Sequence, residues 1–277
     1  MSRTAIRPLD LKEIETLIGW AKAEAWNPGL ADAAPFQAAD AQGLIGCFVD
    51  GVMTAGISAV RYGSSFGFIG LYIAHPDFRG RGYGRLVWDA GMAHLKGRTI
   101  GLDGVPEQQA NYRSMGFAPD YETFRWSGTL EGRSHPQVSP LEKAHLPALI
   151  AFDRRHFAES RPEFLKTWLD VPRQAKVFVR NGLIAGYAVA RQCHQGYKIG
   201  PIFAEDFDVA RGLLFACAME AKGEVLHIDV PAGQTEFSGL LDLKDFVRGF
   251  RTTRMYRGTP PAFDTAGVFG LTTLELG

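Results

Sequence analysis

A short run of alternating arginines and glycines is the segment of this sequence best suited to chemistry. It consists of Arg79, Gly80, Arg81, Gly82, Tyr83, Gly84 and Arg85. An apolar stretch, Phe66 to Ala74, precedes it, and a helical pattern follows it. Where a strand leads through glycines into a helix, backbone N–H groups and the helix dipole bind anions, and arginines add charge suited to phosphate. The glycine spacing fits neither a nucleotide P-loop nor the dinucleotide fingerprint. We therefore expect a pyrophosphate site of another kind.

The elements that must position this loop can be traced along the first half of the chain from hydrophobic periodicity and turn residues. The expected strands are Thr4 to Pro8, Leu44 to Asp50, Val52 to Arg61, Phe66 to Ala74, Thr99 to Asp103 and Tyr121 to Ser127. The expected helices are Leu11 to Ala25, Gly82 to Lys96 and Gln108 to Met115. The loop then joins the fourth strand to the second helix.

The same succession of elements returns about 130 residues later along the chain. Pro8-Leu9-Asp10 corresponds to Pro140-Leu141-Glu142, and Phe48-Val49 corresponds to Phe178-Val179. The shared order of such matches indicates an internal duplication. We therefore expect an α/β (α+β) protein with two similar domains, each a mixed, mostly antiparallel sheet flanked by helices. The expected bounds are residues 1–130 and 138–258, followed by an arm, residues 259–277.

The loop resembles the acyl-CoA signature of the GNAT superfamily of acetyltransferases. That signature is Arg or Gln, two residues, Gly, one residue, and Gly or Ala; Arg79, Gly82 and Gly84 match it without a gap. The resemblance implies acetyl-CoA as cosubstrate, with the loop cradling its pyrophosphate. It further implies that strand backbone around Ile73 binds pantetheine at a bulge. Asn111 and Gln108 are candidate contacts of the cofactor, and solvation on the surface of their helix explains both residues equally well.

A second resemblance to the family is a tyrosine four residues before a Gly-Phe pair. GNAT enzymes often hold the hydroxyl of this tyrosine near the thioester sulfur. Tyr112 stands at that position before Gly116-Phe117. A phenol with an ordinary pKa of about 10 is protonated at neutral pH and can protonate a leaving thiolate. Tyr112 is therefore the expected general acid, although a helix residue that only packs beside Phe117 would show the same pattern.

The general base is less clearly indicated. Many GNAT enzymes carry a glutamate on the strand before the loop, but the strand Phe66 to Ile73 contains no carboxylate. Asp103 and Glu24 are the candidates, each also compatible with a structural role. Removal of the proton through water, with catalysis mainly by positioning, is the other possibility.

The wall of the acceptor site is expected just after the first helix, where GNAT enzymes usually form it. Trp26 and Asn27 are the candidates there, and Tyr72 is a third on the strand before the loop. A capping turn ended by Pro28-Gly29 would explain the first two equally well.

The second half is expected to be a degenerate copy. Val209 and Leu214 replace Arg79 and Gly84, and acidic residues such as Asp206 bring negative charge where pyrophosphate would sit. Leu241 falls near the position of Tyr112. The resemblance to tandem GNAT proteins implies that such a half helps to shape the acceptor cleft.

The amino-acid composition limits the classes of partner that the protein is expected to bind. The 277 residues carry 30 basic and 30 acidic side chains, so no net charge draws the protein to nucleic acid or membranes. The three scattered cysteines suggest no metal site, and we expect a reduced, cytoplasmic protein without a signal peptide or membrane span. Oligomeric state cannot be read from the sequence.

The expected function is transfer of an acetyl group from acetyl-CoA to a primary amine, most simply that of a small molecule. Two other classes stay open. A non-catalytic acyl-CoA sensor would explain the missing strand glutamate, and an unrelated phosphate-ligand enzyme could use the same loop for a nucleotide.

Overall fold

The computed structural model describes residues 3–277, so the first two residues of the expected N-terminal domain lie outside the described part. The first half contains β1 (Thr4–Pro8), α1 (Leu11–Ala23), α2 (Ala33–Ala39), β2 (Leu44–Val49), β3 (Val52–Tyr62), β4 (Phe66–Ala74), η1 (Pro76–Phe78), α3 (Tyr83–His94), β5 (Thr99–Gly104), η2 (Pro106–Gln108), α4 (Gln109–Ser114) and β6 (Ala118–Gly128). Here η denotes a short 3-10 helix. All the elements expected from the first-half sequence are present, with ends displaced by a few residues at most.

The second half repeats this succession. It contains β7 (Val138–Pro140), η3 (Lys143–His145), α5 (Leu146–His156), α6 (Pro162–Trp168), β8 (Gln174–Arg180), β9 (Leu183–Gln192), β10 (Tyr197–Ala204), α7 (Phe207–Ala221), β11 (Leu226–Pro231), α8 (Thr235–Asp242), β12 (Val247–Arg257) and β13 (Val268–Gly270). Helix α3 packs on β2, β3 and β4, and α7 packs on β8, β9 and β10. Equivalent helices thus cover equivalent strands, as a duplication requires.

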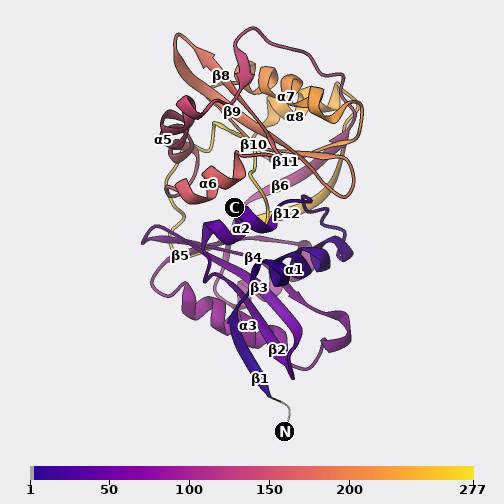
Figure 1. Cartoon of the computed structure of the whole chain (residues 1–277), viewed down its shortest axis with the longest axis vertical. Helices are drawn as coiled ribbons and strands as arrows, with labels where there is room; N and C mark the ends of the chain where they lie inside the picture. Colours follow the sequence, from indigo (N-terminus) through magenta and orange to yellow (C-terminus); the bar gives the residue numbers. More distant parts are fainter. Residues whose placement is uncertain (1–2) are drawn as a thin grey trace.

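The two halves share one sheet because each contributes a strand to the other. Within the described residues the sheet has 13 strands in the order β1-β2-β3-β4-β5-β12-β6-β11-β10-β9-β8-β7, with β13 paired to β10 (Figure 1). The pairs β4–β5 and β10–β11 are parallel, and the other pairs are antiparallel. Strand β12 therefore lies between β5 and β6, and β6 lies between β12 and β11. This exchange leaves neither inner edge unpaired, which protects both halves from pairing with other chains.

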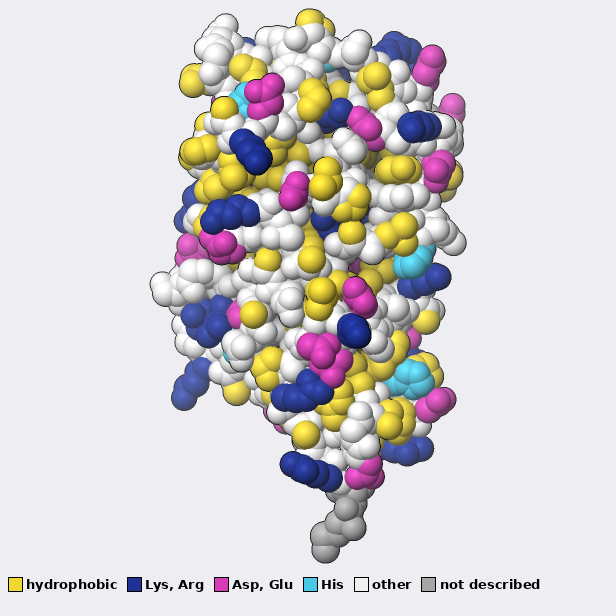
Figure 2. Space-filling view, viewed as in Figure 1, with side chains coloured by type: hydrophobic (Ala, Val, Ile, Leu, Met, Phe, Trp, Pro, Cys, Tyr) yellow, Lys and Arg dark blue, Asp and Glu magenta, His cyan; other side chains and the backbone are white. Residues whose placement is uncertain are grey.

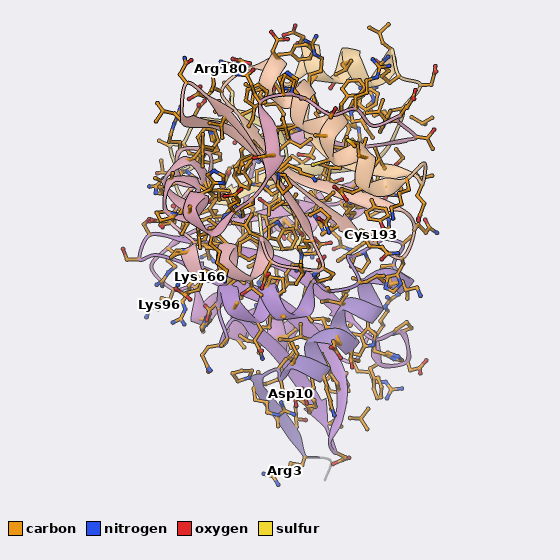
Figure 3. All side chains as sticks on the ribbon, turned by 45° about the horizontal axis from the view of Figure 1, so that its top comes forward. Arg3, Asp10, Lys96, Lys166, Arg180 and Cys193 are labelled. Atoms are coloured by element: carbon orange, nitrogen blue, oxygen red, sulfur yellow. The ribbon has the colours of Figure 1, made fainter. Side chains whose placement is uncertain are left out.

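Apolar contacts continue across the junction of the halves. Leu17 and Phe36 of the first half and Trp168 and Phe203 of the second belong to one buried core. The Phe36 and Trp168 rings stack with centroids 6.5 Å apart. Figure 3 places Cys193 near this junction, where it forms an isolated bridge with Gly29. The halves are thus joined by side-chain packing as well as by exchanged strands.

The last segment, residues 259–277, returns to the first half. The C-terminus accordingly lies between the two halves in Figure 1, far from the N-terminus. The Ser58 hydroxyl donates to the Glu275 carbonyl at 3.0 Å, and the Tyr62 hydroxyl donates to the Leu276 carbonyl at 2.9 Å. Gly70 is needed for this approach, because a Cβ there would lie 2.2 Å from the Glu275 carbonyl oxygen. The arm is therefore fixed against β3 and β4.

The surface carries no single dominant charge on the face drawn in Figure 2, where acidic and basic side chains are interspersed. Among residues 3–277, no helix has the length and apolar character needed to cross a membrane. In the same range, no group of three or more His, Cys, Asp or Glu side chains is arranged to hold a metal ion.

Candidate active site

A cleft of about 660 Å³ lies beside β4, between the two halves. Its walls come from the first half, from the exchanged strands and from the C-terminal arm. The lining residues are Glu24, Trp26, Ile69, Gly70, Leu71, Tyr72, Ile73, Ala74, Arg79, Gly84, Leu102, Asp103, Val105, Glu107, Gln108, Asn111, Tyr112, Arg125, Phe250, Thr252, Leu274 and Glu275. The cleft is large enough for a cofactor arm and a small acceptor together.

Strand β4 opens toward this cleft through a bulge. Gly70 pairs with Ser58 and Ile73 pairs with Gly56, so β4 has one more residue than β3 between these pairs. Leu71 takes a left-handed conformation there, with φ 45°. The parallel pairing of β4 with β5 ends at Ile69. Beyond that point residues 70–74 of β4 line the cleft, in the region where the family resemblance implies pantetheine binding.

The glycine loop forms the start of α3 at one end of the cleft. Gly82 precedes the helix with φ 85°, a conformation that favours glycine. No atom lies within 4 Å of where a Cβ would stand on Gly80 or Gly82, whereas a Cβ on Gly84 would be 3.2 Å from the Tyr72 hydroxyl. The first N–H groups of a helix have no intrahelical partner. The loop is therefore open and exposed, as the binding of an anion would require.

The arginines of the loop take different positions. Arg79 lines the cleft, where it donates to the Ala74 carbonyl at 3.1 Å and forms an ion pair with Glu24. Arg85 pairs with Asp89 along α3 at 2.8 Å, and the Arg81 guanidinium lies 5.5 Å from the Phe78 ring centroid. Tyr83 also packs near Phe78. Arg79 is thus the arginine of this loop that reaches the cleft itself.

Tyr112 lies deeper in the cleft, on α4. Its ring stacks on Trp88 with centroids 5.8 Å apart and meets Phe117 edge-on at 6.3 Å. Only 9% of the residue is exposed, and burial raises the pKa of Tyr112 to about 12. Tyr112 can therefore both pack in the core and donate a proton, since the ring is held in the core and the phenol stays protonated. Asn111, next to it, lines the cleft from the exposed side of α4.

Both expected base candidates line the cleft in ion pairs. Asp103 binds Arg254 of the exchanged strand β12 through two hydrogen bonds of 2.8 and 2.9 Å, with its side chain buried. Glu24 forms an ion pair with Arg79. For Asp103, burial outweighs the charge of Arg254 and raises the pKa of the carboxyl above its ordinary value.

The three residues expected at the acceptor wall are separated by the structure. Trp26 and Tyr72 line the cleft, and the Tyr72 ring lies 5.3 Å from that of Trp88. Asn27 does not line the cleft. Its side chain donates to the Gln195 carbonyl at 2.9 Å and accepts from the Gln195 N–H at 3.0 Å, so it ties the first half to the second.

A buried charge cluster supports Trp26 from behind. The Trp26 carbonyl accepts from Arg125 at 2.9 Å and from Lys198 at 3.1 Å. Arg125 also forms two hydrogen bonds with Asp229, at 2.8 and 2.9 Å. Burial would raise the pKa of Asp229, but the charges of Arg125 and Lys198 outweigh it and lower that pKa to about 2. The cluster joins β6, β10 and β11 and fixes one wall of the cleft.

Several lining residues were not among the site residues expected from the sequence. Arg125 comes from β6, Phe250 and Thr252 come from β12, and Leu274 and Glu275 come from the arm. These segments are more than a hundred residues from the glycine loop or on exchanged strands. No spacing rule connects them with the loop, so only the fold brings them together.

The matching helix of the second half begins at an acidic side chain instead of a glycine loop. Asp206 caps α7 by accepting from the Val209 N–H at 3.0 Å, and it pairs with Arg180 at 2.8 Å. Val209 and Leu214 are fully buried. The helix N-terminus is therefore occupied by a carboxylate of the chain itself, which fits the expectation that this half does not bind CoA.

Comparisons with known proteins agree with this architecture. The Acetyltransferase (GNAT) family profile matches residues 11–118, and an Acetyltransferase (GNAT) domain profile matches residues 149–270. A protein named holothin acyltransferase, from Pseudoalteromonas sp. (strain SANK 73390), is 32% identical over 276 residues, covering 98% of this chain and 94% of the relative.

Solved structures show the same fold. A putative acetyltransferase from Pyrococcus horikoshii has a TM-score of 0.83 at 18% identity, covering 99% of this chain and 96% of its own. A tandem GNAT protein from the clavulanic acid biosynthesis pathway has a TM-score of 0.62 at 14% identity, covering 94% of this chain and all (100%) of its own. With both halves matched by family profiles and a curated acyltransferase aligned along nearly its whole length, the chain belongs to the GNAT acetyltransferase family and contains two GNAT domains in tandem.

Proposed function

We propose that the protein transfers the acetyl group of acetyl-CoA directly to the primary amine of a small molecule, using a single site in its first half. The cleft beside β4 carries this proposal. It joins an open glycine loop, a stretch of β4 backbone released by a bulge, and a buried tyrosine. These three features suit, in order, a pyrophosphate, an extended amide-containing arm and a leaving thiolate.

Different residues of the chain have separate roles in this reaction. Backbone N–H groups of residues 80–84, with Arg79 beside them, bind the pyrophosphate. The backbone of β4 around Ile73, which lines the cleft, orients the thioester. An amine attacks the thioester carbonyl carbon and the C–N bond forms. The C–S bond breaks as the Tyr112 hydroxyl protonates the sulfur, and a proton that leaves the nitrogen restores the hydroxyl. The second half and the arm enclose the acceptor through Phe250, Thr252 and Leu274.

Calorimetric titration with acetyl-CoA tests the cofactor assignment without any knowledge of the acceptor. We expect one site per chain. Gly84→Glu should abolish binding, because the new carboxylate crowds the Tyr72 hydroxyl and places negative charge at the anion site. Gly239→Ala is the matched control, since Gly239 lies on α8 with no atom within 4 Å of its Cβ position. Two sites per chain would show that the second half also binds CoA.

The competing functions give different results in the same experiment. A non-catalytic sensor would bind acetyl-CoA but acetylate no amine in a broad screen. An enzyme for another phosphate ligand would bind a nucleotide that acetyl-CoA does not displace. Binding of acetyl-CoA together with turnover of one amine at an ordinary enzymatic rate would exclude both.

A further inference from the structure

Four carboxylates line the cleft, and their environments differ. Glu24 and Asp103 are each bound to an arginine, and Glu107 is exposed to solvent on η2. Glu275, on the C-terminal arm, is only 4% exposed. Among the described residues no arginine, lysine or histidine lies within salt-bridge distance of its side chain. It is therefore the one lining carboxylate in residues 3–277 that is both enclosed and not neutralised by a direct ion pair.

Short-range contacts fix the position of Glu275. The Thr273 hydroxyl donates to its Oε2, and its own N–H donates to the Thr273 hydroxyl oxygen at 3.2 Å. Its carbonyl oxygen accepts from the Ser58 hydroxyl and lies over Gly70 of β4. The arm thus brings a carboxylate to the bulged part of a strand that has none of its own.

Charged groups from three neighbouring strands surround this carboxylate. Arg125 on β6 and Lys198 on β10 attract it, and Asp103 on β5 repels it. Arg125 and Lys198 are themselves bound to the Trp26 carbonyl, and Arg125 is also bound to Asp229. These cations are thus held by other partners, and neither forms a direct ion pair with the Glu275 carboxylate.

We propose that Glu275 is the general base of the reaction and that the acceptor is a primary amine that arrives as an ammonium ion. This assignment rests on the proposed acetyl transfer. The Glu275 carboxylate takes one proton from the ammonium, so an N–H bond breaks and an O–H bond forms. The freed lone pair attacks the thioester carbon. A second proton leaves the nitrogen and reaches the departing thiolate through the Tyr112 hydroxyl, and Glu275 then releases its proton to solvent.

The decisive variant is Glu275→Gln, which keeps the side-chain shape and a carbonyl oxygen to accept from Thr273. Rates are measured with acetyl-CoA and two aromatic amines, benzylamine, which is a cation at neutral pH, and aniline, which is neutral. For benzylamine we expect kcat/KM to fall by about 10² to 10⁴. For aniline, which needs no deprotonation before attack, the value should stay near wild type. Glu15→Gln, at an exposed position on α1, is the matched control and should change neither rate.

The structure of the acetyl-CoA complex provides a second readout that needs no acceptor. The Glu275 carboxylate should lie within reach of an amine at the thioester carbon, either directly at about 3 Å or through one water. Three results would each overturn the assignment while leaving acetyl transfer intact. They are an equal loss of kcat/KM with both amines, full activity of Glu275→Gln with benzylamine, and a Glu275 carboxylate that lies far from the thioester carbon in the complex. If the protein acetylates neither amine, the position of the Glu275 carboxylate in the acetyl-CoA complex tests the assignment by itself. Failure of the wild-type protein to bind acetyl-CoA would instead remove the proposed function itself.

Discussion

Tyr112 combines two properties that favour proton donation. It is held rigidly between Trp88 and Phe117, and its burial raises the pKa to about 12. A donor with a raised pKa keeps its proton throughout the physiological range. Loss of the Tyr112 proton would therefore lower the catalytic rate only near pH 12, about two pH units above the pKa of an ordinary tyrosine.

We expect Tyr112→Phe to lower kcat by about 10² or more, because the thiolate then leaves without a positioned acid. Acetyl-CoA affinity should change little, since the ring packing is retained. The measurement is steady-state kinetics, with calorimetry as the control for binding. A variant that loses affinity but keeps kcat would show that Tyr112 only helps to bind the cofactor.

Lining the cleft does not by itself make a residue a proton acceptor. Asp103 and Glu24 are present in the cleft as expected, but each is bound to an arginine. The sequence indicates which carboxylates are available, but their pairing depends on Arg254 and Arg79, which lie far from them along the chain. The roles expected for these residues remain predictions.

At the scale of elements, the junction between β4 and α3 gives the site its shape. The bulge turns the end of β4 away from β5, and Gly82 turns the chain into α3 with a positive φ. A residue with a Cβ would hold this left-handed conformation only at a cost of about 1 to 2 kcal/mol.

Gly82→Ala should therefore lower the free energy of unfolding by about 1 kcal/mol and weaken acetyl-CoA binding. No neighbouring atom would clash with the added Cβ, so the effect isolates backbone strain. Gly19→Ala is the control, because Gly19 lies inside α1 with equal space but without a positive φ. That variant should gain about 0.5 to 1 kcal/mol. Equal changes in denaturant unfolding of the two variants would contradict this reading of the loop.

At the scale of the whole molecule, the exchanged strands make the site a joint product of both halves. Arg125 on β6 and Asp229 on β11 form a buried pair directly behind Trp26. Asp229 has an ordinary pKa of 3.8 and a pKa of about 2 in the folded protein. A lowered pKa in the folded state stabilises the protein above the unfolded-state pKa, and this stabilisation is lost as pH falls toward the folded-state value.

We expect Asp229 to contribute about 2 kcal/mol above pH 5 and progressively less down to about pH 2. Asp229→Asn should lower the free energy of unfolding at pH 7 by about 3 kcal/mol, because it leaves the buried charge of Arg125 without a carboxylate. Its stability should also vary less between pH 5 and 2 than that of the wild type. Asp242→Asn, at an exposed position on α8, should match the wild type. Denaturant unfolding across this pH range provides the measurement, and parallel wild-type and Asp229→Asn curves would contradict the assignment.

The sequence by itself predicted the strands and helices of the first half, the duplication and the glycine loop. These features are local: periodicity, turn residues and a signature of six consecutive positions are all contained in short stretches of chain. The order of similar segments in both halves was enough to indicate two related folds.

The tertiary structure alone decided which strands the halves exchange, which carboxylates are bound to arginines, and where the arm lies. Bringing Phe250, Thr252 and Glu275 to the same cleft as Tyr112 depends on pairing β12 with β5 and on seating the arm over Gly70. Such contacts join segments more than a hundred residues apart, and their choice depends on packing and hydrogen bonding summed over the whole molecule. No spacing within one segment could specify them.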